Sequence, residues 1–139
     1  MRALTIRQPW ADAIAHGTKR TENRSWPAPA KHIGTRILVH AAAADDKKAV
    51  LPRDANIGQA FGRIPIAQHG AIIAVATLAG CHFDSGCCTP WGMADYYHWE
   101  LVDVTALPKP AAAKGALGFW TPAEETINAI LRQDTAVAW

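Results

Sequence analysis

The stretch "LTIRQPWADAIAHGTKRTENRSW", residues 4–26, decides the fold that this sequence predicts. "ALTI", residues 3–6, is typical of a short strand. Pro9 at a first helical position and Gly17 as a stop predict a two-turn helix over "PWADAIAHG". "RTENRSW", residues 20–26, alternates in the manner of another strand. The stretch therefore predicts a strand, a short helix and a second strand in succession.

Four charged residues closely follow the predicted helix: Lys19, Arg20, Glu22 and Arg24. Residues three apart on a strand point to opposite faces, so Lys19 and Glu22 can meet only if Lys19 lies before the strand begins. Lys19 would then lie at the helix exit, where the helix dipole favours a cation. The residues alone leave two interpretations open. One is a surface ion pair worth at most about 1 kcal/mol, and the other is a pair that lines a cleft and holds a ligand.

The middle of the chain predicts two further strands and two short helices. "TRILVHA", residues 35–41, is typical of a strand with alternate apolar residues on one side. "AAADDKKAVL", residues 42–51, and "DANIGQAFGR", residues 54–63, predict short helices separated around Pro52. "GAIIAVATLAG", residues 70–80, is almost continuously apolar, which predicts a central strand covered on both faces.

The C-terminal part predicts a strand over "YYHWELVDVTAL", residues 96–107, and a short last strand after the proline- and glycine-rich segment that follows. Thr121 as N-cap, Pro122 at the first helical position and Glu124 in a capping box predict a final helix. The apolar stripe of this helix consists of Ile127, Ile130 and Leu131. Strands interrupted irregularly by helices predict an α+β fold with a mixed sheet, closed or nearly closed into a small barrel.

Length and composition indicate the broad class of protein. A chain of 139 residues predicts a single domain over residues 1–139. The net charge of +2 permits a local basic groove but does not by itself predict a nucleic-acid partner. The N-terminus has no apolar core of signal-peptide length, and nowhere do about 20 apolar residues follow one another. We therefore expect a cytoplasmic protein that does not span a membrane.

The three cysteines Cys81, Cys87 and Cys88 cannot all pair with one another, and the cytoplasm would keep them reduced. The segment "CHFDSGCC" also contains His82, but it lacks the C-x-x-C spacing by which two thiolates reach one ion from a tight turn. We therefore expect no metal site. The sequence has no Ser-His-Asp order and no glycine loop for phosphate, and we expect no cofactor.

The opening stretch also carries a family resemblance. It contains a strand, a Gln-Pro-Trp-Ala helix start, a Gly-x-Lys-x-x-Glu-x-Arg segment and a following Trp; these are Gln8, Pro9, Trp10, Ala11, Gly17, Lys19, Glu22, Arg24 and Trp26. In this order they resemble the opening of an ASCH domain, the activating-signal-cointegrator homology module of the PUA-like superfamily. "RILVHAA", "GAIIAVATL", "YHWELVDVTAL" and "LPKPAAAKGALGFW" are similar to later blocks of that family. The resemblance implies a PUA-like mixed β-barrel of about five to six strands with peripheral helices, and a cleft lined in part by Lys19 and Glu22.

The resemblance also implies a partner. Members of the family are thought to bind nucleic acid, so the expected partner is single-stranded RNA or DNA, or a modified nucleotide. Some small bacterial relatives hydrolyse acylated nucleosides or RNA, so a hydrolase with Lys19 and Glu22 as catalytic groups is the alternative. The relatives that act on acylated cytidine carry Thr where this chain has Glu22, which argues against that reaction. A protein-interaction module with no ligand in the cleft is a third hypothesis.

The candidate nucleic-acid-binding residues of the cleft are Arg7, Trp10, Lys19, Glu22, Arg24, Trp26, His40 and Trp91. Trp26 and Trp91 lie beside prolines and glycines in predicted loops, from which an indole can stack on an unpaired base. Trp10 is the tryptophan of the family's Gln-Pro-Trp-Ala helix start. Its apolar surroundings nevertheless favour a place in the core, as they do for Trp99 and Trp120.

Two of these candidates have equally simple structural interpretations. Arg7 precedes the first predicted helix and brings a positive charge to the cleft rim, or is merely solvated. His40 closes the strand "RILVH" at the family's position for a polar residue near the cleft, or is a histidine whose hydrogen bonds are satisfied at a strand end.

Overall fold

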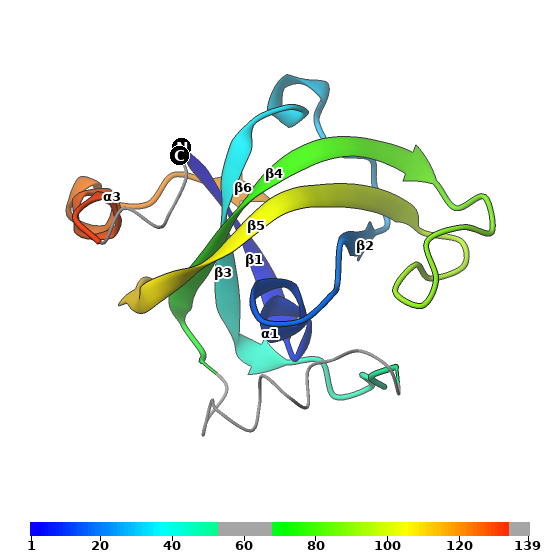
Figure 1. Ribbon diagram of the computed structural model, residues 1–139, viewed down its shortest axis with the longest axis horizontal. Helices are drawn as coiled ribbons and strands as arrows, with labels where there is room; N and C mark the ends of the chain where they lie inside the picture. Colours follow the sequence, from blue (N-terminus) through cyan, green and yellow to red (C-terminus); the bar gives the residue numbers. More distant parts are fainter. Residues whose placement is uncertain (53–67, 134–139) are drawn as a thin grey trace.

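Six strands form one strongly curled sheet (Figure 1). The computed structural model describes residues 1–52 and 68–133. The strands are β1 (Arg2–Gln8), β2 (Thr21–Arg24), β3 (Arg36–Asp45), β4 (Ala71–Phe83), β5 (Tyr97–Ala112) and β6 (Phe119–Trp120). The helical elements among these residues are α1 (Trp10–Ala15), the 3-10 turn η1 (Ala30–His32) and α3 (Glu124–Leu131).

The sheet is mixed, with the strand order β2-β5-β4-β3-β1-β6. β1 and β3 run parallel, whereas the other neighbouring strands pair antiparallel. The sheet curls into a half-barrel, with α1 and α3 on different sides of it (Figure 1). The predicted α+β fold with a mixed sheet is therefore confirmed.

The central strands are covered on both faces. The cluster on the α1 side includes Leu4, Ile6, Ile14, Val39, Ile73 and Trp99. The cluster on the α3 side includes Ala3, Leu38, Ile72, Val75 and Ile130. Neighbours such as Ile72 and Ile73, both at most 2% exposed, go to opposite clusters because successive strand residues point to opposite faces. This confirms the prediction of a central strand covered on both faces.

The short helix α1 depends on its surroundings. With six residues it is far below the roughly 12–15 residues that an isolated helix needs for even marginal stability. Its first turn is held by Gln8, whose Oε1 accepts a hydrogen bond from the backbone N–H of Asp12 at 2.9 Å. Pro9, predicted at the first helical position, is the N-cap instead, and Trp10 begins the helix.

The helix predicted over residues 42–51 is wrong. β3 continues through the alanines as far as Asp45. Its pairing with β1 extends to Gln8 and Asp45, so hydrogen bonds to the neighbouring strand override the helix propensity of alanine. The helix predicted over residues 54–63 lies outside the described residues.

β5 is longer than predicted and continues past residue 107 to Ala112. Pro108 and Pro110 do not stop it, because its pairing with β4 skips from Ala106 to Ala111 and neither proline has to donate a ladder hydrogen bond. The strand is therefore irregular where the prolines lie.

α3 begins later than predicted. Glu124 is its first residue, Ala123 is the N-cap, and no side chain caps the helix. The predicted N-cap Thr121 and first helical residue Pro122 are wrong, because Thr121 directly follows β6 and a residue before proline disfavours the helical region. Within residues 1–52 and 68–133, no helix has the length and apolar character needed to cross a membrane.

Candidate functional site

A buried group of charges lies between α1 and β2. Lys19 Nζ is 3.6 Å from Glu22 Oε1, and Arg24 Nη2 donates a hydrogen bond to Glu22 Oε2 at 3.0 Å. Lys19 and Glu22 are only 2% and 6% exposed. The two side chains therefore form a buried ion pair, and not the solvated surface pair that the residues alone permitted.

The local fold explains this arrangement. β2 begins at Thr21, so Lys19 precedes the strand, while Glu22 and Arg24 lie on one face of it. Arg20 has a different role: its guanidinium donates to the backbone oxygens of Ile14 and Lys19 at 3.1 and 2.9 Å, next to the end of α1. The charged segment thus supplies one residue to the helix end and three to the buried group.

Two tryptophans flank the Lys19 ammonium. Its Nζ lies 5.6 Å from the ring centroid of Trp10 and 5.9 Å from that of Trp91. The two indoles are perpendicular, with centroids 6.4 Å apart. Lys19 also donates a hydrogen bond to the backbone oxygen of Thr21. Burial lowers the pKa of Lys19, and the carboxylate of Glu22 opposes that shift.

A pocket of about 420 Å³ opens over these side chains. Trp10 and Trp91 line it together with Lys19 and Glu22, which as nearly buried groups form its inner wall. A volume of this size falls within the range of about 300–1,000 Å³ that small-molecule sites occupy.

A second pocket of about 500 Å³ adjoins the first and is lined by Arg7, Arg24 and Trp26, among others. The lining residues common to both pockets are Trp10, Glu22, Asn23 and Asp46. Because of this shared wall, we treat the two pockets as one continuous depression and refer to it as the Trp10 groove.

A family model described as ASCH domain matches residues 4–111, a range that includes the whole inner wall of the first pocket. The chain belongs to the ASCH family. The curled, mixed sheet agrees with the PUA-like fold of an ASCH domain, and membership is consistent with an RNA-binding domain. No curated protein matches the chain.

The groove of this ASCH domain brings together seven of the eight candidate binding residues; His40 is the exception. His40 is 1% exposed, with Nδ1 3.2 Å from Thr5 Oγ1 and Nε2 2.7 Å from the Ala113 backbone oxygen. Burial lowers its pKa, and the bond to Ala113 opposes the shift. His40 itself lines neither pocket, although its partner Thr5 lines the second one. Both of its ring nitrogens have hydrogen-bond partners, which agrees with the structural interpretation of this residue.

Four tryptophans of the ASCH domain can be compared with the prediction that each belongs to the core or to the cleft, and Trp10 and Trp91 differ from it in part. Trp99 is 1% exposed in the core, as predicted, and Trp26 is 50% exposed beside the second pocket. Trp91 lies in the loop between β4 and β5, as predicted, but it is only 7% exposed because it belongs to the wall of the first pocket. Trp10 lines both pockets.

Asp46 is a groove residue that the sequence analysis missed. Trp10 Nε1 donates a hydrogen bond to Asp46 Oδ2 at 2.8 Å, and this bond lowers the pKa of Asp46. The error followed from the helix predicted over residues 42–51, which gave Asp46 no position near Trp10. The available signal was the acidic pair Asp45 and Asp46, which follows the run of alanines after His40.

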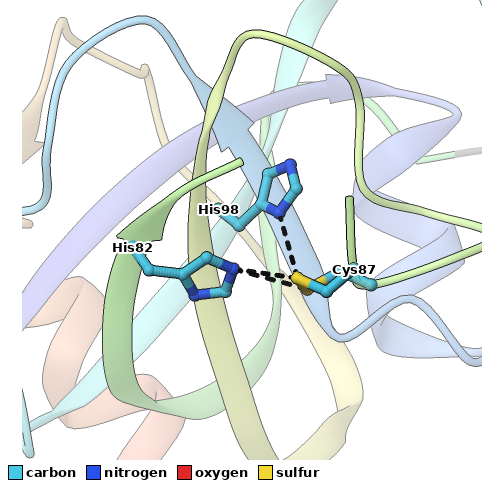
Figure 2. Close-up of side chains that lie close together, drawn as sticks. His82, Cys87 and His98 are labelled. Carbon is cyan, nitrogen blue, oxygen red and sulfur yellow. Dashed lines mark hydrogen bonds between the residues drawn. A yellow bond between two sulfur atoms is a disulfide. The ribbon is translucent and has the colours of Figure 1, made fainter. Parts of the chain in front are cut away.

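The structure also gathers a second group of side chains that the sequence analysis did not assemble. His82, at the end of β4, and His98, at the start of β5, both direct a ring nitrogen at the sulfur of Cys87 (Figure 2). Cys88 completes a group of four possible metal ligands, all with ligand atoms within 4.8 Å of one another. His98 was missed because it comes from the strand after the loop.

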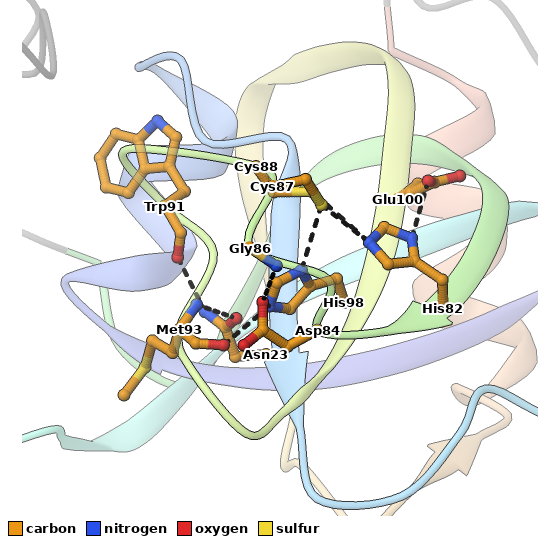
Figure 3. Close-up of a disulfide and its surroundings, with 10 residues drawn as sticks. All are labelled: Asn23, His82, Asp84, Gly86, Cys87, Cys88, Trp91, Met93, His98 and Glu100. Atoms are coloured by element: carbon orange, nitrogen blue, oxygen red, sulfur yellow. Dashed lines mark hydrogen bonds and ion pairs between the residues drawn. A yellow bond between two sulfur atoms is a disulfide. The ribbon is translucent and has the colours of Figure 1, made fainter.

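The loop between β4 and β5 is fastened to the groove through Asn23 of β2. The Asn23 side chain donates to the backbone oxygen of Trp91 at 3.0 Å and accepts from the backbone N–H of Met93 at 2.9 Å (Figure 3). This role of Asn23 was not predicted from the sequence. The same loop therefore contains both the cysteines and the indole of the first pocket.

Proposed function

We propose that this ASCH domain binds single-stranded nucleic acid and holds one base, or a modified base, in the first pocket of the Trp10 groove. The observation that supports this proposal most strongly is the buried Lys19–Glu22 pair in the wall of a pocket that is flanked by two indoles. A buried ion pair is weak support for stability because desolvating both charges is costly. A pair retained in a pocket wall is better explained by a ligand.

The pair supplies two complementary hydrogen-bonding groups. An ammonium donates to a carbonyl or a ring nitrogen, and a carboxylate accepts from an exocyclic amine or a ring N–H. Lys19 Nζ and Glu22 Oε1 are 3.6 Å apart, so together they suit a base edge that places an acceptor beside a donor. Proteins read unpaired bases through such edges and stack them on aromatic side chains.

The second pocket suits the flanking nucleotide. Trp26 is 50% exposed there, and a base stacked on it would contribute roughly 1–3 kcal/mol. Arg7 is exposed beside it and Arg24 is partly exposed, so positive charge is available for a phosphate. The groove thus offers a base site, a stacking surface and a backbone contact in sequence.

Binding of labelled single-stranded RNA and DNA is expected to weaken with salt. With about two to three phosphate contacts, the affinity should fall roughly 10-fold between about 50 and about 200 mM salt, because each contact releases counterions. Fluorescence anisotropy at both concentrations measures this, with a duplex of the same sequence as comparison. Equal affinity at both salt concentrations, or stronger binding of the duplex, would contradict the proposal.

A hydrolase that uses the same pocket is the second candidate, and one observation favours it. Burial lowers the pKa of Lys19, which raises the fraction of neutral amine at a given pH. A neutral amine beside a carboxylate can act as general base or nucleophile on a nucleoside amide or an RNA phosphodiester. Lys19 and Glu22 would be the catalytic groups.

Turnover separates the hydrolase from a pure binder. The purified chain is incubated with acylated cytidine and with short RNA, and products are followed by chromatography. Lys19→Met, which removes the amine but keeps the length of the side chain, is the matched control. Product formed by the wild type alone supports the hydrolase, whereas equal rates for both proteins indicate a contaminant. No product excludes hydrolysis of those substrates.

A further inference from the structure

The loop between β4 and β5 brings two histidines and two cysteines to one point. His82 Nε2 is 3.0 Å from Cys87 Sγ and 3.5 Å from Cys88 Sγ, and His98 Nδ1 is 3.8 Å from Cys87 Sγ (Figure 2). In a tetrahedral zinc site, bonds of about 2.3 Å to sulfur and about 2.0–2.1 Å to nitrogen place these two kinds of ligand about 3.5 Å apart. The three nitrogen–sulfur distances are close to that value.

The two imidazoles are also oriented for a shared ion. Their ring centroids are 5.2 Å apart and their planes are nearly perpendicular, at 79°. Two histidines that each direct one nitrogen at the same zinc ion place their ring centres about 5 Å apart when the site is tetrahedral. The arrangement therefore suits one ion without movement of either strand.

Each histidine is held by a hydrogen bond from its other nitrogen (Figure 3). His98 Nε2 is 2.8 Å from the backbone oxygen of Met93, which can only accept, so Nε2 carries the proton and Nδ1 presents its lone pair. His82 Nδ1 is 3.1 Å from Glu100 Oε1, a carboxylate partner that likewise leaves Nε2 free to ligate. Such outer partners orient histidine ligands in most metal sites.

The backbone closes tightly around the group. A Cβ on Gly92 would lie 2.8 Å from Cys88 Cβ and 2.9 Å from His98 Cε1, so only glycine lets the loop pack against these side chains. Cys88 has a φ of 70°, a left-handed conformation that costs a residue other than glycine about 1–2 kcal/mol. Both sulfurs lie within 3.5 Å of His82 Nε2.

We propose that the reduced chain binds one zinc ion through His82 Nε2, Cys87 Sγ, Cys88 Sγ and His98 Nδ1. This replaces the expectation from the sequence, which considered only the segment "CHFDSGCC" and did not include His98. Two thiolates and two neutral imidazoles suit tetrahedral Zn²⁺ better than the harder ions Mg²⁺ and Ca²⁺. The two negative charges of the thiolates also neutralise the ion.

Metal binding requires the cysteines to be reduced, because the structure joins Cys87 and Cys88 as a disulfide. A phosphine reductant supplies the two electrons that break the sulfur–sulfur bond, and water supplies two protons and leaves its oxygen on phosphorus. Zn²⁺ then displaces both thiol protons as the two metal–sulfur bonds form. In the oxidised chain Cys87 and Cys88 supply no thiolate, so this form does not bind zinc at the site.

The site would fix the loop that supplies Trp91 to the first pocket. Asn23 holds that loop from the side of β2, and the metal would hold it from the ends of β4 and β5. The loop would then be fastened on both sides. Zinc binding is nevertheless independent of any nucleic acid, so a failure of the proposed function would leave it unaffected.

Titration of the phosphine-reduced 139-residue chain with Co²⁺, followed by displacement with Zn²⁺, tests the site. We expect saturation at about one ion per chain, with sulfur-to-cobalt charge transfer and the strong visible bands of tetrahedral Co²⁺. The oxidised chain, which needs no substitution, should show neither. Absence of saturable binding to the reduced chain, or equal binding to the oxidised one, would overturn the proposal.

Three variants localise the ion. Cys88→Ser should abolish the charge-transfer band, or reduce it together with a large loss of metal affinity. Cys81→Ser should leave the band and the affinity unchanged. Cys81 lies outside the site, and its Sγ accepts a hydrogen bond from the Ala28 backbone N–H at 3.3 Å. Glu100→Gln should weaken binding by about 10- to 100-fold through loss of the carboxylate partner of His82. Circular dichroism of the metal-free variants checks their folding. Equal spectra and affinities for Cys88→Ser and Cys81→Ser would contradict the assignment.

Discussion

Glu22→Gln is expected to lower the free energy of unfolding by about 3–5 kcal/mol, because it leaves the buried Lys19 and the partly buried Arg24 without their carboxylate. Lys19 is 2% exposed and Arg24 contacts the same carboxylate at 3.0 Å, so the substitution places two cations beside a neutral amide. The shape of the side chain is unchanged. Urea denaturation of wild type and variant measures the difference.

Glu125→Gln is the matched control for that experiment. Glu125 is exposed in the first turn of α3, where loss of its charge should cost less than about 1 kcal/mol. The double variant Lys19→Met/Glu22→Gln should recover much of the loss, because it also removes the buried ammonium. If Glu22→Gln lowered the free energy of unfolding no more than Glu125→Gln does, the result would contradict the buried position that the structure gives to the charges of Lys19 and Glu22.

Lys19→Met is expected to change stability and binding in opposite directions. The free energy of unfolding should rise by about 1 kcal/mol, because the desolvated ammonium is exchanged for an apolar group while Glu22 keeps Arg24 as its partner. The thioether also packs favourably against Trp10 and Trp91. Affinity for single-stranded RNA should fall roughly 10- to 150-fold, the effect of losing a hydrogen bond to a charged group worth about 1.5–3 kcal/mol. Thermal melts and anisotropy titrations measure the two effects.

The gain in stability from Lys19→Met should depend on pH. The pKa of Lys19 is lower in the folded chain than its ordinary value of 10.5, so between these two values the unfolded chain binds more protons. The free energy of unfolding of the wild type therefore rises with pH between the folded-state pKa of Lys19 and 10.5. The difference in stability between Lys19→Met and the wild type is largest at pH values below this range. A variant that is less stable than the wild type at neutral pH, or that binds RNA equally well, would contradict the account of this side chain.

Much of the fold follows from apolar periodicity. Residues 71–80 belong to the central strand β4 because all of them except Thr77 are apolar, and the register with β3 and β5 then covers both faces. The alanines after His40 show where periodicity fails. Alanine suits a helix or a strand, and the pairing of β3 with β1, which local sequence does not contain, decided for the strand.

The candidate site was predictable only in part. The spacing of Lys19 and Glu22 around the start of a strand permitted them to meet, but it did not predict that both are buried or that the Lys19 ammonium lies between two indoles. Contacts that join distant segments were not predictable from the sequence, such as Trp10 with Asp46, or His82 with His98 across the loop. Each depends on the curl of the sheet and the path of a loop, which have no local signal.

The most direct test of the proposed base site is a titration of the ¹⁵N-labelled domain with single-stranded RNA, observed at the tryptophan indole N–H resonances. Trp10 Nε1 donates to Asp46 and Trp91 Nε1 to Thr18, so a base entering the first pocket would disturb both bonds. We predict saturable shifts of these two indole resonances, while the backbone amides of α3 stay in place. Binding that shifts α3 or other regions and leaves the indoles of Trp10 and Trp91 unchanged would contradict the proposal.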